Sequence, residues 1–272
     1  MHANPRLRAA LLERRRRRGV PGAGAPRPRR ADGYEFAEVR EYVAGDDPRR
    51  IDWAATARAG ALQTRVMYED HALVLAGVLD SSLSMSVGRD RSQYDLASAA
   101  LAAWYALATA EDRCVRVASD AVFADARRRG RSSAHVCAAL ADRPGSRLDA
   151  MLETALATVP RDASLLVVSD FYEFDGLLPL LRRVAGRCDL TALVARDPWH
   201  AEFPLAGFVR LRDAESGAVR RVWIGRAERT RYAAAVAARE ARLRESLESM
   251  GVRCAPLASD PEAALAEAFG LA

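Results

Sequence analysis

The chain has 272 residues, half of them hydrophobic, so it is long enough to bury a substantial core, and disorder throughout is not expected. Its net charge of +5 comes from the first 30 residues, which contain ten Arg and one Glu. The rest is close to neutral, so the charge does not indicate a nucleic-acid-binding face on the fold. The chain contains no Lys, and a composition this biased makes Arg richness a poor functional sign.

The cysteines and the apolar runs predict a cytoplasmic protein. The four cysteines are far apart and form no C-x-x-C pair, which argues against a zinc site or disulfide framework and suits a reducing compartment. They are Cys114, Cys137, Cys188 and Cys254. No apolar segment follows the N-terminal charges, and no apolar run approaches the roughly 20 residues of a membrane span. We therefore expect no membrane span.

Residues 1–32 are predicted to be an Arg-rich flexible tail. A short helix is possible over Arg6–Arg18, but the following VPGAGAPRPRR stretch is too rich in Pro and Gly for regular structure. The Arg14–Arg18 run would suit an anionic partner, yet a solvated tail is the simpler interpretation. Nucleic-acid binding is not expected. Residues 33–71 are interpreted as an N-terminal extension of a main domain that spans 72–272.

From Ala72 onward, short apolar runs alternate with helix-like stretches. Continuous apolar runs are typical of strands buried on both faces, so the pattern predicts an α/β domain with a mostly parallel sheet between two helical layers. The expected strands are 72–80, 114–120, 164–170 and 188–195, and the expected helices are 92–110, 132–142, 149–158 and 177–185.

After Asp197 the pattern changes. The stretch VRLRDAESGAVRRVWIG predicts a hairpin that turns at Glu215–Gly217. A long charged helix is expected over Ala227–Met250, followed by a strand at 252–257 and a closing helix at 261–269.

Two of the apolar strands end in oxygen-bearing side chains. LVLAGVLD continues into SSLSMS, and SLLVVSD ends at Asp170. In a doubly wound sheet, ligands bind beyond the carboxyl ends of the strands, where the strand order reverses. The D-x-S-x-S spacing allows Asp80, Ser82 and Ser84 to point toward one centre. Carboxylate and hydroxyl oxygens suit Mg²⁺, Mn²⁺ or Ca²⁺.

At these residues the sequence resembles a known family. The segment REYVAGDDPRRIDWAATAR (Arg40–Arg58), the following LDSSLSMSVG and the later DPWHAEFPLAGFVRLRDAESG look like the MoxR-associated branch of von Willebrand factor A-like proteins, catalogued as a domain of unknown function. The resemblance implies a three-layer, doubly wound α/β fold of von Willebrand factor A type with an N-terminal extension. It also implies a metal-ion-dependent adhesion site.

In that site, the D-x-S-x-S residues, a Thr on another loop and a later Asp surround the cation. The resemblance implies Asp80, Ser82, Ser84 and Asp170 as ligands. PGSRLDAML stands where the family reads Gly-Thr-Asp before a Leu, so Ser146 is the counterpart of the Thr, and Arg147 replaces the acid. The family implies a non-enzymatic adaptor or cochaperone for a MoxR-type AAA+ ATPase, acting on an unknown client protein.

The segment GDDPRRIDW has two interpretations. In the first, its charged residues contact a partner, together with Arg58; these residues are Asp46, Asp47, Arg49, Asp52 and Arg58. In the second, which we favour, Gly45 and Asp46 form a turn, Trp53 is a core anchor and Arg58 ties the extension to the sheet through an ion pair or a carbonyl group.

Two alternatives remain open beside the adaptor. One is a metal-dependent, phosphatase-like hydrolase, although Ser82 stands where haloacid-dehalogenase phosphatases carry their acid/base Asp. The other is a scaffold with a degenerate metal site. A serine hydrolase would need a G-x-S-x-G elbow and a nucleotide hydrolase a Walker A motif, and the sequence contains neither.

Overall fold

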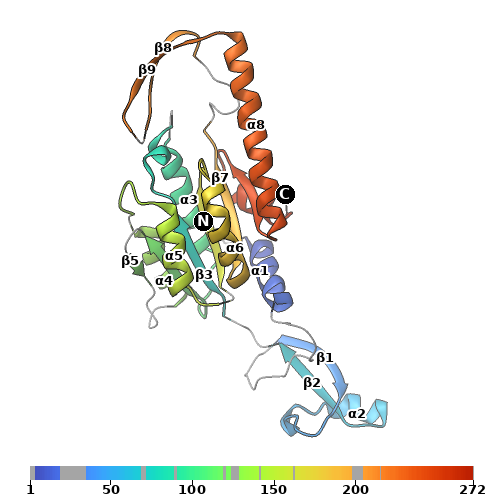
Figure 1. Ribbon diagram of the computed structural model, residues 1–272. Helices are drawn as coiled ribbons and strands as arrows, with labels where there is room; N and C mark the ends of the chain where they lie inside the picture. The colour runs from blue at the N-terminus through green and yellow to red at the C-terminus, as the bar shows by residue number, and fades with distance from the viewer. Residues whose placement is uncertain are drawn as a thin grey trace. The chain divides into compact units, whose positions relative to one another are not determined.

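The computed structural model describes residues 4–18, 35–68, 72–88, 91–118, 121–123, 129–140, 142–161, 163–197, 205–214 and 216–271. The chain forms two compact units (Figure 1). The larger unit contains residues 1–17 and 73–272, and the smaller contains residues 18–72. This division differs from the predicted one, because the N-terminal helix belongs to the larger unit.

The larger unit is built on a six-stranded sheet with the order β10-β7-β6-β3-β4-β5. Its strands are β3 (Val74–Leu79), β4 (Arg113–Ala118), β5 (Ala121–Phe123), β6 (Ser164–Ser169), β7 (Asp189–Ala195) and β10 (Arg253–Leu257). Five strands are parallel, and only β5 pairs antiparallel, with β4. Numbered along the chain, this is the order 6-5-4-1-2-3 of a doubly wound sheet. The predicted α/β class is confirmed; the short antiparallel β5 was not predicted.

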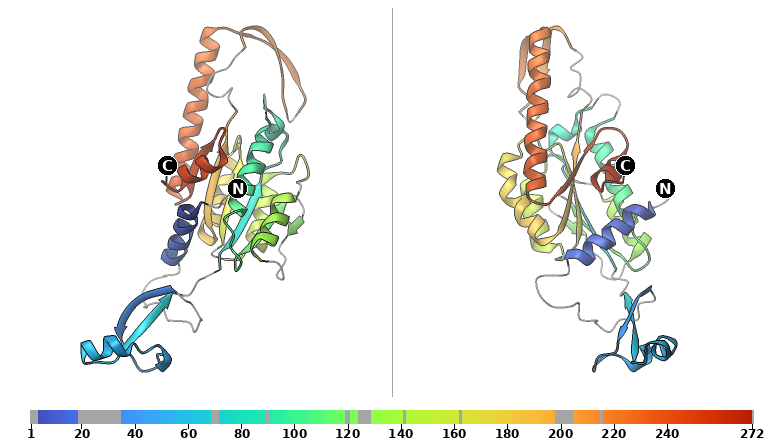
Figure 2. Two further views of the ribbon diagram at one scale, coloured as in Figure 1. Left: turned by 180° about the vertical axis from the view of Figure 1, so that it is seen from behind. Right: turned by 90° about the vertical axis from the view of Figure 1, so that its right-hand side faces the viewer.

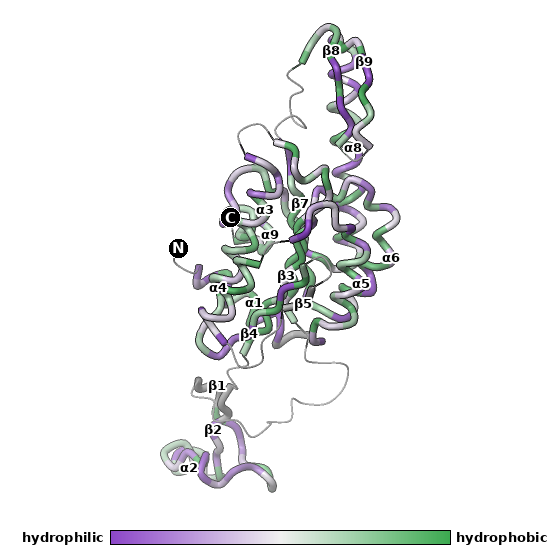
Figure 3. The backbone as a smooth tube through the Cα atoms, turned by 90° about the vertical axis from the view of Figure 1, so that its left-hand side faces the viewer, coloured by the Kyte–Doolittle hydropathy of each residue, from purple (hydrophilic) through white to green (hydrophobic). Residues whose placement is uncertain are grey.

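Helices cover both faces of this sheet (Figure 2). One face carries α1 (Pro5–Arg18), α3 (Gln93–Tyr105), α4 (Gly130–Ala139) and α9 (Pro261–Ala268), and the other carries α5 (Leu148–Thr158), α6 (Leu178–Arg187) and α8 (Arg226–Ser249). Along β3, Leu75 and Leu79 enter one core cluster, whereas Ala76 and Val78 enter the other. Burial on both faces explains why the strands read as continuous apolar runs (Figure 3).

The helix that follows the D-x-S-x-S loop packs closely against β3. A Cβ atom on Gly77 would lie 2.4 Å from Leu101 Cδ1 and 2.6 Å from the Tyr105 hydroxyl oxygen, so only Gly allows this approach. The indole nitrogen of Trp104 donates a hydrogen bond to the Ala76 carbonyl oxygen at 3.1 Å. These contacts hold α3, and with it the end of the loop, in a fixed position over the strand.

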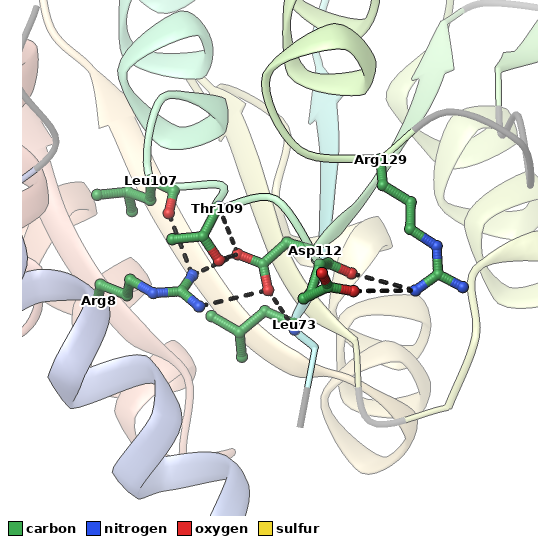
Figure 4. A network of polar contacts seen from close by, with 7 residues as sticks. Arg8, Leu73, Leu107, Thr109, Asp112 and Arg129 are labelled. Carbon is green, nitrogen blue, oxygen red and sulfur yellow. Dashed lines mark hydrogen bonds and ion pairs between the residues drawn. The ribbon is translucent and has the colours of Figure 1, made fainter. Parts of the chain in front are cut away.

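The N-terminal helix α1 is held by the core and is not a flexible tail. Leu7 and Leu11 are fully buried in the cluster formed with α3 and α9. Arg8 forms an ion pair with Asp112, which also accepts hydrogen bonds from the Leu73 amide at 2.6 Å and the Thr109 amide at 2.7 Å (Figure 4). The prediction of a solvated tail is therefore wrong for α1, because its apolar side chains complete the core. Residues 19–34 lie outside the described part of the chain.

The smaller unit is a two-stranded antiparallel sheet with two short helices between its strands. It contains β1 (Glu35–Glu41), η1 (Pro48–Arg50), α2 (Trp53–Ala59) and β2 (Gln63–Tyr68). The predicted turn at Gly45 and Asp46 is present, and Gly45 has a φ of 111°. The prediction that Trp53 is a core anchor is wrong, since it begins α2 with 69% of its surface exposed. Strands of the extension were not predicted.

Beyond β7 the chain forms the predicted hairpin and long helix. The hairpin pairs β8 (Gly207–Arg212) with β9 (Val219–Ile224), and α8 follows directly. The predicted turn includes Glu215, which lies outside the described residues. No helix within the part of the chain that the structure describes combines the length and apolar character that a membrane crossing requires.

Candidate metal-binding site

The two aspartates selected from the sequence lie at the ends of neighbouring strands. Asp80 directly follows β3 and Asp170 directly follows β6, and these strands pair in parallel at the point where the strand order reverses. The Asp80 amide donates to the Val168 carbonyl oxygen at 2.9 Å, which continues the ladder to the edge of the sheet. Both side chains are buried, at 4% and 7% exposure. The predicted convergence is therefore present at the switch point.

Each carboxylate is oriented by a tight turn. Asp80 Oδ1 accepts a hydrogen bond from the Ser82 amide at 2.9 Å, and Asp170 Oδ1 accepts one from the Tyr172 amide at 3.0 Å. A hydrogen bond from the amide of residue i+2 to the side chain of an aspartate at residue i defines an Asx turn. This turn bends the chain as it leaves the strand. The Ser169 hydroxyl donates to Asp80 Oδ2 at 2.6 Å, so the two strand ends are also joined side chain to side chain.

The two serines of the motif lie together. The hydroxyl oxygens of Ser82 and Ser84 are 3.0 Å apart, on either side of the first residue of η2 (Leu83–Ser86). Met85 is fully buried within the same turn and anchors it to the core. The alternation predicted from the D-x-S-x-S spacing is thus realised as one turn of 3-10 helix.

A separate loop brings Ser146 beside this turn. Ser81 forms an isolated antiparallel bridge with Ser146, its carbonyl oxygen accepts from the Gly145 amide at 2.6 Å, and its hydroxyl donates to the Arg143 carbonyl oxygen at 2.9 Å. The Ser146 hydroxyl donates to the same carbonyl oxygen at 2.7 Å. An oxygen that donates one hydrogen bond keeps lone pairs that can bind a cation.

Arg147 does not bring an uncompensated charge to the site. Its side chain is 81% exposed and pairs with Asp149, with Nε–Oδ1 and Nη2–Oδ2 distances of 3.1 and 2.5 Å. The hydrogen bond from Arg147 lowers the pKa of Asp149, so the acid is ionised near neutral pH and offsets the guanidinium charge. The replacement of the family's acid by Arg147 therefore adds little net charge to this loop.

The surroundings of the two aspartates differ from those of three other buried acids, Asp112, Asp142 and Asp189. Within the described ranges, Asp112, Asp142 and Asp189 are buried and each pairs with an arginine. Neither Asp80 nor Asp170 forms an ion pair with any described arginine. Burial raises the pKa of Asp80, and the nearby Asp170 carboxylate raises it further, against hydrogen bonds from Ser169 and Ser82 that lower it.

Buried carboxylates are normally paired with a cationic side chain or coordinate a metal ion. Two carboxylates and three hydroxyl groups supply only hard oxygen donors, so the residues present fit Mg²⁺, Mn²⁺ or Ca²⁺. No group of three or more His, Cys, Asp or Glu side chains suited to a metal occurs among the residues that the structure describes. Any cation held at Asp80 and Asp170 would therefore rely on hydroxyl oxygens and outside ligands.

Comparison with known proteins now places the chain in a family. Residues 38–242 match the family described as "Protein of unknown function DUF58". The chain belongs to the DUF58 family. It is also 33% identical over 239 residues to uncharacterized proteins of Mycobacterium tuberculosis and Mycobacterium bovis, and the match covers 84% of this chain and 75% of each relative. The resemblance seen in the Arg40–Arg58 segment is confirmed at the level of this family.

Two solved structures resemble this DUF58 chain loosely. One is an aerotolerance-related membrane protein from Bacteroides fragilis, with a TM-score of 0.42, 15% identity, and coverage of 74% of this chain and all of that one. The other is the conserved hypothetical protein BatB from Bacteroides thetaiotaomicron, with a TM-score of 0.34, 12% identity, and coverage of 66% and 99%. Both TM-scores are too low to support an inference about this chain.

Sequence reasoning missed the residues that hold Asp170 in place. Phe171 is fully buried and has a φ of 48°, which is rare for a bulky residue and costs conformational energy. Its amide donates to the Ser169 hydroxyl oxygen at 2.9 Å. Arg239 of α8 donates to the Phe171 and Tyr172 carbonyl oxygens at 3.1 and 3.2 Å. The polar Ser169 at the end of the apolar SLLVVS strand was the available sequence signal.

A second missed pair supports the loop that carries Ser146. Arg116 lies within β4 and is buried, and it pairs with Asp142, which also accepts a hydrogen bond from the Tyr94 hydroxyl at 3.2 Å. Burial raises the pKa of Asp142, whereas the Arg116 charge lowers it. The signal was the Arg in the apolar run CVRVA, because an arginine buried in a strand requires an acidic partner.

Several charged residues of the smaller unit make local contacts. Asp46 pairs with Arg40 at 2.8 Å, and Asp52 caps α2 through the Ala55 amide and pairs with Arg65 at 2.8 Å. Asp47 caps η1 through the Arg49 amide. Arg58 is exposed, and no hydrogen bond or ion pair joins it to any described residue. Asp46, Asp47 and Asp52 thus have local structural roles, and the clamp expected of Arg58 stays a prediction.

Proposed function

We propose that this DUF58 protein is a protein-binding module of von Willebrand factor A type whose binding depends on a divalent cation held at Asp80 and Asp170. The observation that carries the proposal is the electrostatic contrast among the buried acids. Asp112, Asp142 and Asp189 each pair with an arginine, whereas no arginine in the described part of the chain pairs with Asp80 or Asp170 at the ends of their strands. A divalent cation would supply the missing positive charge.

The proposed ligands divide the task between charge and geometry. Asp80 and Asp170 would provide the negative charge, Ser82 and Ser84 neutral hydroxyl oxygens, and Ser146 a further hydroxyl from the neighbouring loop. Mg²⁺ is the favoured ion, with Mn²⁺ or Ca²⁺ as substitutes, because all donors are hard oxygens. A bound cation with an open position would accept a carboxylate from a partner protein. Two protein carboxylates are few, so affinity for the cation should rise when the partner supplies a third.

Binding is favoured over hydrolysis by the residue two positions beyond Asp80. A phosphatase of haloacid-dehalogenase type needs a carboxylic acid there to donate and accept protons. Ser82 occupies that position, and a serine hydroxyl is a poor general acid or base near neutral pH. We therefore propose that the site breaks no bond in its partner.

The proposed partner is a MoxR-type AAA+ ATPase, with an unidentified client protein as the final target of an adaptor or cochaperone. This part of the proposal rests on the resemblance of Arg40–Arg58 and Leu79–Gly88 to the MoxR-associated branch. ATP hydrolysis is assigned to the ATPase, since this chain has no Walker A motif. The exposed charges of the smaller unit, such as Arg49 and Arg58, are proposed as secondary contacts.

The test is direct binding of the purified MoxR-type ATPase from the same genome, measured by biolayer interferometry with magnesium present. Asp80→Asn keeps the side-chain shape and removes the charge, and Glu153→Gln is the matched control on the exposed face of α5. We expect Asp80→Asn to weaken binding at least tenfold and the control to leave it unchanged. A chelator would also strip the ATPase of its nucleotide-bound magnesium, so the variant is the deciding arm.

The outcomes separate the proposal from the remaining alternative. If Asp80→Asn and Glu153→Gln bind the ATPase equally well, the adhesion-site mechanism is wrong and the fold is a scaffold with a degenerate site. If neither variant nor the wild type binds, the MoxR-type partner is wrong, and the cation dependence must be tested on the chain itself, as set out at the end of the Discussion.

A further inference from the structure

The β8–β9 hairpin presents one face to solvent. In its antiparallel register, Phe208 pairs with Trp223, Arg210 with Arg221, and Arg212 with Val219. Residues directly opposite each other, and those two positions along, point to the same side of a sheet. These six residues therefore share one face, and all six are exposed. We call it the aromatic–arginine face. The opposite face carries the partly buried Val209, Leu211 and Val222, together with the exposed Arg220 opposite Leu211.

Two aromatic rings occupy one end of this face. Phe208 is 84% exposed and Trp223 58% exposed, and their ring centroids are 4.9 Å apart in an edge-on arrangement. The pair keeps both rings in place and leaves most of their surface in water. Large aromatic side chains exposed side by side are unfavourable in an isolated monomer, and such residues are enriched at the centres of protein interfaces.

Three arginines occupy the rest of the face. Arg210 and Arg221 stand directly opposite each other, and a like-charged pair at such a position destabilises the hairpin. Arg212 adds a third positive charge at the next position on the same side. None of the three forms an ion pair with a carboxylate in the part of the chain that the structure describes. A carboxylate-bearing partner would relieve this repulsion.

The aromatic–arginine face lies at the functional end of the larger unit. The hairpin extends beyond the end of the sheet at which β3 terminates (Figures 1 and 2). Strand β6 runs parallel to β3 and terminates at the same end. That end carries Asp80 and Asp170. Along the hairpin, hydrophilic and hydrophobic residues alternate (Figure 3), as expected for a ribbon with two different faces.

We infer that the aromatic–arginine face binds an acidic protein segment in which Asp or Glu residues alternate with apolar residues. Carboxylates would pair with Arg210, Arg212 and Arg221, because guanidinium groups form bidentate hydrogen bonds with carboxylates. Apolar side chains of the segment would cover Phe208 and Trp223. The inference deepens the proposed function, on which it rests for the identity of the partner: a protein that offers one carboxylate to the cation offers further ones to the hairpin.

Two features favour a protein over a membrane or a nucleic acid. The free end of the hairpin is polar, because Asp213 Oδ1 accepts hydrogen bonds from the Ser216 amide and hydroxyl, both at 2.6 Å; an anionic tip opposes insertion into an anionic membrane. The exposed rings of Phe208 and Trp223 offer a contact for apolar side chains, which a protein segment supplies and the phosphate backbone of a duplex does not.

The test uses a short fluorescein-labelled peptide of alternating Glu and Leu, measured by fluorescence anisotropy with EDTA present so that the cation plays no part. Arg210→Glu/Arg221→Glu reverses two charges on the face. The matched control, Arg182→Glu/Arg183→Glu, reverses two exposed charges on α6. We expect the first variant to weaken binding at least tenfold and the control to leave it unchanged. Phe208→Ala should weaken binding severalfold.

Three outcomes would overturn the inference. They are equal loss in both double variants, equal binding of a peptide with Gln in place of Glu, and hairpin-dependent binding of duplex DNA or phosphatidylglycerol vesicles that exceeds that of the peptide. Because the assay contains no free divalent cation, its failure does not touch the proposed cation site. Equally, a normal result here combined with an Asp80→Asn variant that binds the ATPase like wild type would overturn the cation mechanism alone.

Discussion

The buried aspartates at the two ends of the parallel sheet have different partners. At the end where the strands begin, Asp112 accepts hydrogen bonds from two backbone amides and pairs with Arg8 of α1 (Figure 4). At the end where they finish, Asp80 is also buried and receives hydrogen bonds from Ser82 and Ser169, but no described arginine pairs with it. The first arrangement completes the fold, and the second, which has no arginine among the described residues, is the basis of the proposed cation site.

The largest expected effect comes from removing the Asp112 carboxylate at the end of the sheet where the strands begin. Asp112→Ala should lower the free energy of unfolding by about 3–5 kcal/mol, because it leaves Arg8 partly buried and the Leu73 amide without its acceptor. Urea unfolding followed by circular dichroism measures this. Asp175→Ala is the control, since it removes only an exposed pair with Arg242 and should change stability by no more than about 1 kcal/mol. Equal losses would mean that Asp112 has no special structural weight.

A smaller effect is expected when Asp112 is left without its arginine, so that its surroundings resemble those of Asp80. Arg8→Ala removes the guanidinium group and leaves Asp112 buried with hydrogen bonds from neutral donors alone, which is the situation of Asp80. We expect a loss of about 1–3 kcal/mol in urea unfolding and increased proteolysis of α1, because the helix loses its link to Asp112 and keeps its apolar contacts and the ion pair between Arg14 and Asp189. If stability and proteolysis are unchanged, a buried carboxylate without a cation is not costly in this fold, and the argument for Asp80 fails with it.

The smallest expected effect concerns Asp46, an acid of the smaller unit. The hydrogen bond from Arg40 holds the pKa of Asp46 below its ordinary value of 3.8. Since the folded pKa is the lower one, the stability contributed by the pair is complete above pH 3.8 and is lost as the pH falls through the folded pKa. Amide exchange at residues 40–46 should therefore accelerate as the pH is lowered below about 4, after correction for intrinsic rates. In Arg40→Gln this acceleration should be weaker, and an unchanged profile would contradict the assignment.

The sequence predicted the sheet well because burial on both faces leaves a clear record. Runs such as LVLAGVL and SLLVVS contain few polar residues, and each became a central strand. Residues of the smaller unit left no such record, since its hairpin buries little and Trp53 is exposed. The helix over residues 5–18 was recognised as possible, but its Arg-rich composition concealed that Leu7 and Leu11 enter the core.

The candidate site was predictable as far as its motif reached. Asp80, Ser82, Ser84 and Asp170 follow from spacing and strand ends, and Ser146 from the family resemblance. The supporting contacts could not be read in the same way. Ser169 reaches Asp80 across 89 positions of the chain, and Arg239 reaches Phe171 from a helix 68 positions away. Such pairs depend on the tertiary arrangement of strands and helices and have no local pattern.

The central claim is that Asp80 and Asp170 need a cation, and thermal unfolding of wild type and Asp80→Asn with EDTA or magnesium tests it most directly. In EDTA, we expect Asp80→Asn to be as stable as wild type or more so, because it removes an unbalanced buried charge. Magnesium at a hundred times its dissociation constant should stabilise wild type by about 2.7 kcal/mol and leave the variant unchanged. Equal stabilisation of both proteins by magnesium, or none in either, would contradict the claim.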